Sequence, residues 1–491
     1  MEINCPFDEL YAAEISALLK PPPLPQVQEY FDQLLESRQC RGITVKHGGE
    51  NGKGVYANID YKEGELVLRD DMLFGSQHSS NKIDCLVCSF CFRFIGSVEL
   101  QIGRRMFFQD LGIHPHHGCN AEMLSDLSNT QRASDSSDDE DIPYSGSYDN
   151  IETCGSSSTG EIMPLSKKTI ESLMDGELIL PCSEKFPLPP VVACSGDCKE
   201  AYYCSKRCAD ADWNSFHSLL CTGERSEASS REALLGFIKH ANETNDIFLL
   251  AAKAVSFTIL RYRRLTGARL NQQASPYISN NCDVSLLLEA WKPISVGHKK
   301  RWWECVALPE DVASSEECAF RMQIKDLAFE SLQLLRAAIF AKECAPLFSL
   351  EIYGHIIGMF ELNNLDLVVA SPVEDYFLYI DDLPSYKKEE AEKVTKPILD
   401  ALGEEYSANC EGSAFFPLQS CMNHSCLPNA KAFKRDEDRD GRAIIIAQRP
   451  ICRGEEVTIS YIDEDLTFQE RQAALADYGF TCRCSRCQED V

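Results

Sequence analysis

Cysteines at short, paired spacings are the residues of this sequence whose chemistry is most specific. Cys88 and Cys91 form one pair, and a second group follows downstream: Cys194, Cys198, Cys204, Cys208, His217 and Cys221. Thiolates and a neutral imidazole are ligands that zinc prefers, and a short spacing lets one turn of backbone present two of them. Seven thiols and one imidazole are enough for two tetrahedral zinc sites, which would help a loop-rich module to fold. Cys85 and Cys88 also have this spacing, so Cys85 is an alternative to Cys91.

A third cysteine cluster lies in "FTCRCSRCQ", near the end of the sequence. Cys482, Cys484 and Cys487 supply three thiolates, one fewer than a tetrahedral zinc site needs. Cys426, in the run "NHSC", is a natural fourth ligand. We therefore expect a third zinc ion that ties the C-terminal segment to this run.

Composition limits the kinds of partner. The chain has 491 residues, 24 cysteines and a formal net charge of −28. We expect no direct binding to nucleic acid or to anionic membrane, because both are polyanions, and we expect a basic protein partner such as a histone tail. The N-terminal stretch "MEINCPFDELYAAE" lacks the basic start and apolar block of a signal peptide, and no run of 18 residues is apolar. We expect an intracellular protein.

Strands and helices alternate in blocks along the chain. Strand patterns occupy 42–75, in "GVYANI" and "GELVLR", and 443–461, in "AIIIAQ" and "VTISYI". Helical periodicity marks 229–264, 322–345 and 386–402. The stretch from about 120 to 180 is acidic and rich in Ser and Gly, which predicts a disordered insert. Thr467 and Glu470 form a capping box that opens a last helix, and Gly479 suits its left-handed end.

The stretch "CSGDCKEAYYCSKRCADADWNSFHSLLC" resembles the MYND zinc finger. In that family the ligands interleave, so the resemblance assigns them in two sets. One zinc would bind Cys88, Cys91, Cys204 and Cys208. The other would bind Cys194, Cys198, His217 and Cys221. MYND fingers bind protein segments, often proline-rich ones, which implies a proline-rich or transcription-factor partner here.

The motifs "NHSCLPN", "RGEEVTISYID" and "DYGFTCRCSRC", with "NGKGVYANIDYKEGELVLR" upstream, resemble the SET domain of protein lysine methyltransferases. A SET domain split by a MYND finger is the layout of the SMYD family and of similar plant trithorax-related proteins. The resemblance implies an α+β chain, in which a β-rich SET fold is split by the finger and carries a helical insert and a post-SET zinc segment. We expect these segments: 1–37 helical, 38–84 first part of the SET domain, 85–221 finger with its insert, 222–345 helical, 346–466 second part of the SET domain, and 467–491 post-SET.

The resemblance also implies a cofactor and site residues. S-adenosyl-L-methionine would be bound by Asn51, Gly52, Lys53, Gly54, Asn423, His424, Tyr461 and Phe480. Tyr461 would lie beside the transferred methyl group, and Tyr478 would form another wall of the lysine channel. Lysine must be neutral to attack, although its ordinary pKa is about 10.4, and a narrow apolar channel lowers that pKa. In "EIYGHIIGMFELNN", Gly358 stands where the family has a cofactor-binding Asn, so Asn363 and Asn364 are candidates to replace that contact.

The predicted function is transfer of a methyl group from S-adenosyl-L-methionine to protein lysines, with the histone H3 tail as the expected substrate. A non-catalytic adaptor that binds partners through the finger is one alternative, and a methyltransferase for non-histone proteins is another. We expect a nuclear chromatin regulator that is also present in the cytoplasm.

Overall fold

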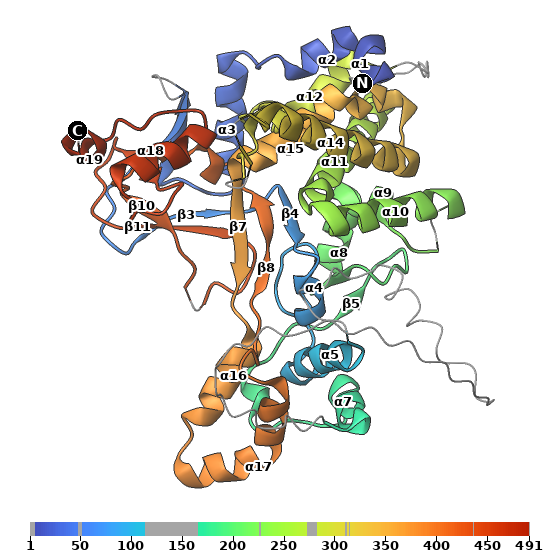
Figure 1. The fold of residues 1–491 in the computed structure, drawn as a ribbon, viewed down its shortest axis with the longest axis vertical. Coiled ribbons are helices and arrows are strands. Elements are labelled where there is room, and N and C mark those ends of the chain that lie inside the picture. Colours follow the sequence, from blue (N-terminus) through green and yellow to red (C-terminus); the bar gives the residue numbers. More distant parts are fainter. Residues whose placement is uncertain are drawn as a thin grey trace.

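The structure is a computed structural model that describes residues 5–47, 52–112, 165–224, 227–272, 282–309, 312–313, 315–435 and 437–490. Separate helices and mostly antiparallel sheets make up the chain, which confirms the predicted α+β class. The sheets occupy the middle of the molecule, with helices above and below them (Figure 1).

Three small sheets contain the strands of the two segments that resemble a SET domain. The first has the strand order β1-β2-β12-β9, with bounds Ile43–His47, Lys53–Ala57, Glu456–Ile459 and Asn423–His424. The second has the order β10-β11-β3, with bounds Ala430–Ala432, Ala443–Ala447 and Leu66–Asp70. The third has the order β4-β8-β7, with bounds Phe74–Gln77, Cys410–Phe415 and Asn364–Val369. A separate ribbon pairs β5 (Val192–Ala193) with β6 (Tyr202–Tyr203).

Each of these three sheets joins strands from distant parts of the chain. Strand β12 pairs antiparallel with β2 and parallel with β9, in a register that sets Ile459 opposite His424. Val55 of β2 and Val457 of β12 are completely buried between these sheets and α3 (Leu24–Ser37). Apolar burial in one shared core explains how strands near opposite ends of the sequence form a single domain.

A helical region covers one end of the sheets, at the top right of Figure 1. It contains α1 (Pro6–Leu10), α2 (Ala12–Leu19), α10 (Ala228–Thr244), α11 (Ile247–Gln272), α12 (Val284–Ser295), α13 (Trp302–Cys305), α14 (Glu317–Ile339) and α15 (Leu350–Asn363). The N-terminal helices belong to it, because the Trp291 indole N–H donates to the Leu18 carbonyl at 2.9 Å inside this core.

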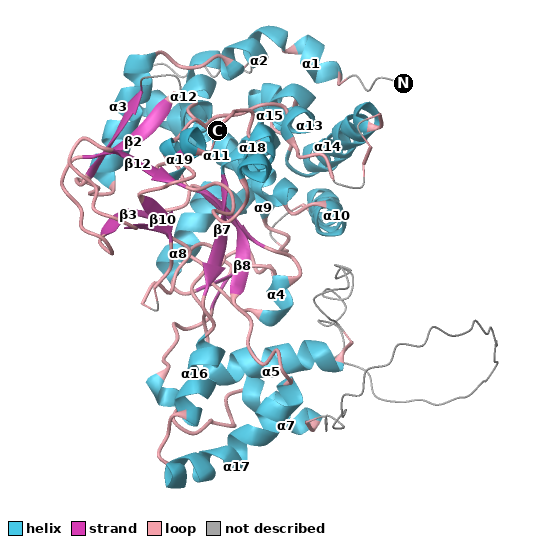
Figure 2. Cartoon of the chain, turned by 60° about the vertical axis from the view of Figure 1, so that its left-hand side comes forward, coloured by secondary structure: helices cyan, strands magenta, loops and turns pink. Residues whose placement is uncertain are grey.

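A second helical group lies at the opposite end of the molecule (Figure 2). It consists of α5 (Val98–Asp110), α7 (Lys167–Met174), α16 (Pro372–Asp381) and α17 (Ser385–Leu402). Leu173 and Tyr376 are completely buried in its core. The prediction of a disordered insert from about 120 to 180 is therefore wrong for residues 165–180, where α7 forms, and its remainder to residue 164 lies outside the described residues.

Short elements complete the chain. They are α4 (Asn81–Asp84), α8 (Lys206–Asp212), α9 (Ser218–Leu220), α18 (Phe468–Asp477), α19 (Ser485–Glu489), a π-helical turn (Trp213–His217) and 3-10 turns at Ser183–Lys185, Lys342–Phe348 and Gln419–Cys421. The capping box predicted for α18 is present, and Gly479 has φ +84° just past the helix. None of the described helices combines the length and the apolar character needed to cross a membrane.

Candidate functional site

The finger brings its eight predicted ligands together as two groups of four. Cys88, Cys91, Cys204 and Cys208 form one group, and Cys194, Cys198, His217 and Cys221 form the other. Within each group the sulfur and nitrogen atoms all lie within 4.8 Å of one another. The π-helical turn Trp213–His217 directs His217 at Cys198, with Nε2 3.2 Å from Sγ. The interleaved arrangement is therefore the one that the structure has, while zinc binding itself stays a prediction.

The sulfur spacings fit zinc. A tetrahedral ion with Zn–S bonds of about 2.3 Å holds its sulfurs about 3.8 Å apart. In the finger the Sγ atoms of Cys204 and Cys208 are 3.4 Å apart, and those of Cys194 and Cys221 are 3.8 Å apart. Cys85 is directed elsewhere: its thiol donates to the carbonyls of Ala408 and Asn409, and burial raises the pKa of this thiol. Cys91, and not Cys85, thus lies with Cys88.

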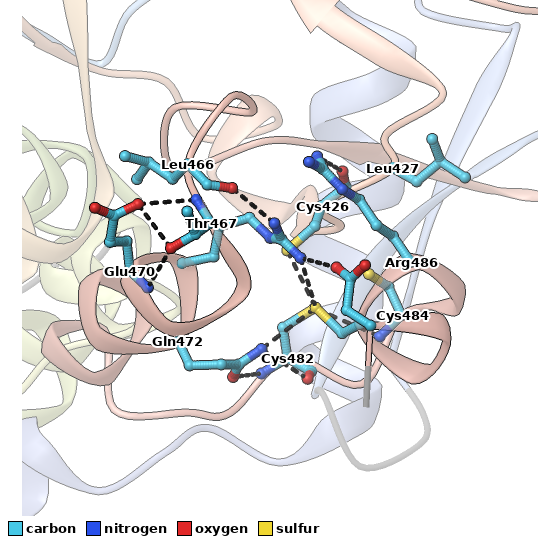
Figure 3. A network of polar contacts seen from close by, with 12 residues as sticks. Cys426, Leu427, Leu466, Thr467, Glu470, Gln472, Cys482, Cys484 and Arg486 are labelled. Carbon is cyan, nitrogen blue, oxygen red and sulfur yellow. Dashed lines mark hydrogen bonds and ion pairs between the residues drawn. The ribbon is translucent and has the colours of Figure 1, made fainter.

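The third cluster joins the "NHSC" loop to the C-terminal segment (Figure 3). Cys426, Cys482, Cys484 and Cys487 place their sulfurs within 4.8 Å of one another, and the Sγ atoms of Cys426 and Cys487 are 3.5 Å apart. The Gln472 amide donates to Cys487 Sγ at 3.3 Å, which directs α18 onto the cluster. Four soft ligands and surrounding donors suit a structural zinc ion.

The loop beside this cluster presents a polar surface to the Gly-x-Gly turn. The Asn423 amide N–H₂ group donates to the Lys53 carbonyl at 2.9 Å and to Glu456 Oε1 at 2.7 Å. Gly54 permits this approach, because a Cβ there would lie 2.6 Å from the Glu456 carboxylate oxygen and 3.3 Å from the Asn423 amide nitrogen. Asn423 Oδ1 accepts no hydrogen bond from the described residues and can accept one from a ligand's ammonium group.

The His424 ring has a fixed orientation and a fixed tautomer. Its Nδ1 accepts the backbone N–H of Tyr461 at 3.0 Å, so the ring proton lies on Nε2, which is 3.2 Å from Cys426 Sγ. Burial, with a smaller contribution from the Arg471 charge, lowers the pKa of His424 to about 4. The imidazole is therefore neutral, and the ring links the strand that carries Tyr461 to the cysteine cluster.

Aromatic rings form a wall next to this loop. The Tyr461 ring centre lies 5.2 Å from that of Tyr478 and 5.4 Å from that of His424. Phe480 lies 6.0 Å from His424 and leaves 38% of its surface exposed, so one face is available to a flat ring. The Tyr461 hydroxyl donates to the Met422 carbonyl at 2.5 Å. A hydroxyl and a carbonyl oxygen thus meet beside these aromatic rings.

Neither tyrosine of this wall ionises easily. Burial is the main cause that raises the pKa of both phenols, and neighbouring negative groups raise it further. Those groups include Glu361 and Asp366 for Tyr478. Both phenols remain protonated near neutral pH, where they donate hydrogen bonds and do not act as bases.

Gly358 is packed too tightly to be replaced by Asn. A Cβ there would lie 2.1 Å from the Lys300 carbonyl oxygen and 3.0 Å from the Trp302 backbone nitrogen. Asn363 cannot use its amide N–H₂ group as the substitute, because this group donates to the carbonyls of His298 at 2.9 Å and Met359 at 2.7 Å.

Asn364 faces a different cavity. That cavity, of about 570 Å³, is also lined by His78 and Asp246 and by none of the predicted cofactor residues. The structure thus gives no support for a replacement contact from Asn363 or Asn364, because the Asn363 amide is bonded elsewhere and Asn364 lines this other cavity.

The sequence analysis missed some residues of the site, and one residue that it predicted cannot be placed. Asn51 lies outside the described residues. The Met422 carbonyl and the Glu456 carboxylate were missed, because a backbone acceptor carries no sequence signal and Glu456 is one of many exposed-looking acids. The segment 296–302 was missed as well. Its basic run "HKKRWW", residues 298–303, could have indicated a functional segment, but a short basic run is equally typical of a solvent-exposed surface.

The loop at Asn423, the paired tyrosines and the C-terminal segment with its cysteine cluster together have the arrangement of a SET domain. Comparison with known proteins agrees: a family model described as SET domain matches residues 52–462. Histone-lysine N-methyltransferase ATXR2 of Arabidopsis thaliana is 62% identical to this chain over 98% of both proteins. Protein-lysine N-trimethyltransferase SMYD5 of Gallus gallus is 25% identical over 58% of this chain and 63% of its own length.

The chain belongs to the SET domain family, whose members use S-adenosyl-L-methionine to methylate lysine. A shorter match, to histone-lysine N-methyltransferase SET5 of Meyerozyma guilliermondii, is 38% identical over 18% of each chain. The predicted class of enzyme, a protein-lysine N-methyltransferase, is thereby confirmed.

Proposed function

We propose that this chain transfers a methyl group from S-adenosyl-L-methionine to lysine side chains of histones, with the H3 tail as its substrate. The observation that carries the proposal is the meeting of the Tyr461 hydroxyl with the Met422 carbonyl, beside the paired rings of Tyr461 and Tyr478. We propose that these two rings line the passage for the substrate lysine. Such oxygens can hold a methyl group through weak C–H···O contacts while the passage aligns the amine.

Different residues would bind different parts of the cofactor. Asn423 Oδ1 would accept from the ammonium group of the cofactor, Phe480 would cover its adenine, and the backbone at Gly52 and Lys53 would bind its amino-acid end. Gly52, with φ +77°, permits the turn that directs this backbone. When bound, the cofactor would supply a sulfonium methyl group: a neutral amine can attack its carbon in one step, and S-adenosylhomocysteine would leave as the C–S bond breaks.

The lysine must lose its proton without help from a basic side chain of the wall. Tyr461 and Tyr478 remain protonated, and both His424 ring nitrogens already have partners. The aromatic passage supports deprotonation indirectly, because an apolar environment disfavours the ammonium form. We therefore infer that the proton leaves to solvent before methyl transfer.

A histone substrate is supported by charge and by similarity. The formal net charge of −28 favours association with a basic tail, and the relative that is similar over nearly the whole chain is named a histone-lysine methyltransferase. Action on histones would require a nuclear location, which we propose together with a cytoplasmic pool. We also propose that the finger binds a proline-rich or transcription-factor segment, as its MYND resemblance implies, and that all three cysteine clusters hold zinc.

The test is methyl transfer by the zinc-loaded chain to core histones and, separately, to proteins of a cell extract. Tyr461→Phe serves as the control, because it removes only the hydroxyl that contacts the Met422 carbonyl. We expect labelled histone H3, and at least about 10-fold less label with the variant. Label on extract proteins alone would overturn the histone assignment, and absence of both transfer and cofactor binding would favour the adaptor.

A further inference from the structure

A connecting segment crosses the cofactor side of the SET domain. We call residues 296–302 the strap; it joins α12 to α13. At one end the Lys53 ammonium donates to the Val296 carbonyl, which fixes the strap to the Gly-x-Gly turn. At the other end Lys300 reaches Gly479, where an added Cβ would lie 2.5 Å from Lys300 Nζ. The strap thus spans the distance between two predicted cofactor-binding segments.

Lys300 Nζ lies close to the aromatic wall. Gly479 is the residue between Tyr478 and Phe480, whose rings face Tyr461 and His424 respectively. Gly479 adopts φ +84°, so its lack of a side chain serves both the left-handed turn and the close approach of the ammonium group. A cation therefore lies beside the segment that carries Tyr478 and Phe480.

Lys299, the preceding residue, contacts the end of α12 instead. The Lys299 ammonium donates to the carbonyls of Ile294, Ser295 and Gly297 at 3.0 to 3.3 Å, which caps the C-terminal end of α12. Lys300 has no acidic partner among the described residues, although it is half-buried. An unpaired, half-buried ammonium favours an anionic ligand.

The packing at Gly358 explains why a cation is available at this place. The strap lies against α15 at Gly358, where the resemblance implies a cofactor-binding Asn, and only Gly leaves room for the Lys300 carbonyl. Asn363 is bonded to the strap, and Asn364 lines another cavity. The backbone of the strap thus occupies the space that a side chain at position 358 would need, and the strap carries a lysine there.

We propose that Lys300 binds the α-carboxylate of S-adenosyl-L-methionine, in place of the missing Asn. This inference rests on the proposed function. The carboxylate is the only anionic group of that cofactor, and Asn423 Oδ1 suits the ammonium group bonded to the same carbon. Lys53 is less suited to the carboxylate, because its ammonium already donates to Val296 and lies over the Phe31 ring.

The test measures binding rather than turnover. Titration calorimetry would compare wild type and Lys300→Met with two ligands, S-adenosylhomocysteine and its decarboxylated analogue. Lys300→Arg keeps the charge and serves as the rescue variant. Lys292→Met removes a half-buried lysine of α12 outside the strap and is the matched control.

We expect Lys300→Met to raise the Kd of S-adenosylhomocysteine about 10-fold or more, since a charge-assisted hydrogen bond is lost. The Kd of the decarboxylated analogue should change less than about 2-fold, and Lys300→Arg should recover most of the affinity. Equal weakening of both ligands, or no weakening of either, would overturn the inference. If the wild-type chain does not bind S-adenosylhomocysteine, both the proposed function and this inference are overturned. Measuring wild type first therefore separates failure of the proposed function from failure of the inference about Lys300.

Discussion

Replacing Gly358 by Asn, the residue that the resemblance implies at this position, should destabilise this protein. In Gly358→Asn the new Cβ would start 2.1 Å from the Lys300 carbonyl oxygen, and the neighbouring atoms at 3.0 Å also belong to the strap backbone. Ordinary van der Waals contacts of a Cβ begin at 3.4 Å, so the strap would have to move by more than about 1 Å. Overpacking of this kind costs about 3 kcal/mol in the free energy of unfolding.

Gly236→Asn is the matched control for this change. Gly236 also lies inside a helix, α10, but an added Cβ there would meet nothing within 4 Å. Its free energy of unfolding should stay within about 0.5 kcal/mol of wild type. The assay is thermal unfolding followed by titration with S-adenosylhomocysteine.

We expect Gly358→Asn to lower Tm by at least about 3 °C and to weaken S-adenosylhomocysteine binding, because the strap that carries Lys300 is displaced. The reasoning would be refuted by a variant that keeps the Tm of wild type and binds the ligand more tightly. That result would mean that the Asn side chain fits and contacts the ligand, as the resemblance implies.

Three further predictions follow from the cysteine clusters, the loop and the strap. Elemental analysis should find three zinc ions per wild-type chain and two in Cys487→Ser. Cys318→Ser, which removes an exposed thiol outside the clusters, should keep all three. Three zinc ions in Cys487→Ser would contradict the third site. Asn423→Ala should raise the Kd of S-adenosylhomocysteine at least about 10-fold by titration calorimetry, whereas Asn58→Ala, which loses a bond in a distant turn, should not. Burial, and then the Lys53 charge, lowers the pKa of Lys299 to about 8 from 10.5. Between pH 8 and 10.5 the unfolded chain binds more protons at Lys299 than the folded chain does. The Tm of wild type relative to that of Lys299→Met should therefore rise as pH increases over this range. A difference in Tm that does not change with pH would contradict this.

The cysteine clusters of this site could be predicted from the sequence, because they depend on local chemistry. Cysteine spacing indicated which side chains would meet, because metal ligands must be presented by short turns, and the same twelve residues lie in three groups. The strands β2, β3, β11 and β12 followed from alternation and turn residues. The choice between Cys85 and Cys91 needed the structure, since both spacings satisfy the same rule.

Long-range packing supplied the rest. Helix α7 was assigned to the polar insert, because its buried residues Ile170 and Leu173 form one narrow apolar stripe in a charged stretch. The strap and Gly358 are separated in the sequence by α13 and the whole of α14, and nothing local to either segment shows that they touch. A glycine that looks like a lost ligand is instead a point of close backbone approach.

The most direct test of the central claim is tandem mass spectrometry of core histones after incubation with the zinc-loaded chain and S-adenosyl-L-methionine that carries a deuterated methyl group. The predicted result is deuterated methyl on lysine side-chain amines of histone H3, at a level that falls sharply with Tyr461→Phe. Unlabelled histones, from a chain whose cofactor binding is intact and whose extract proteins carry the label, would contradict the histone assignment. Unlabelled proteins in both samples would contradict catalysis itself.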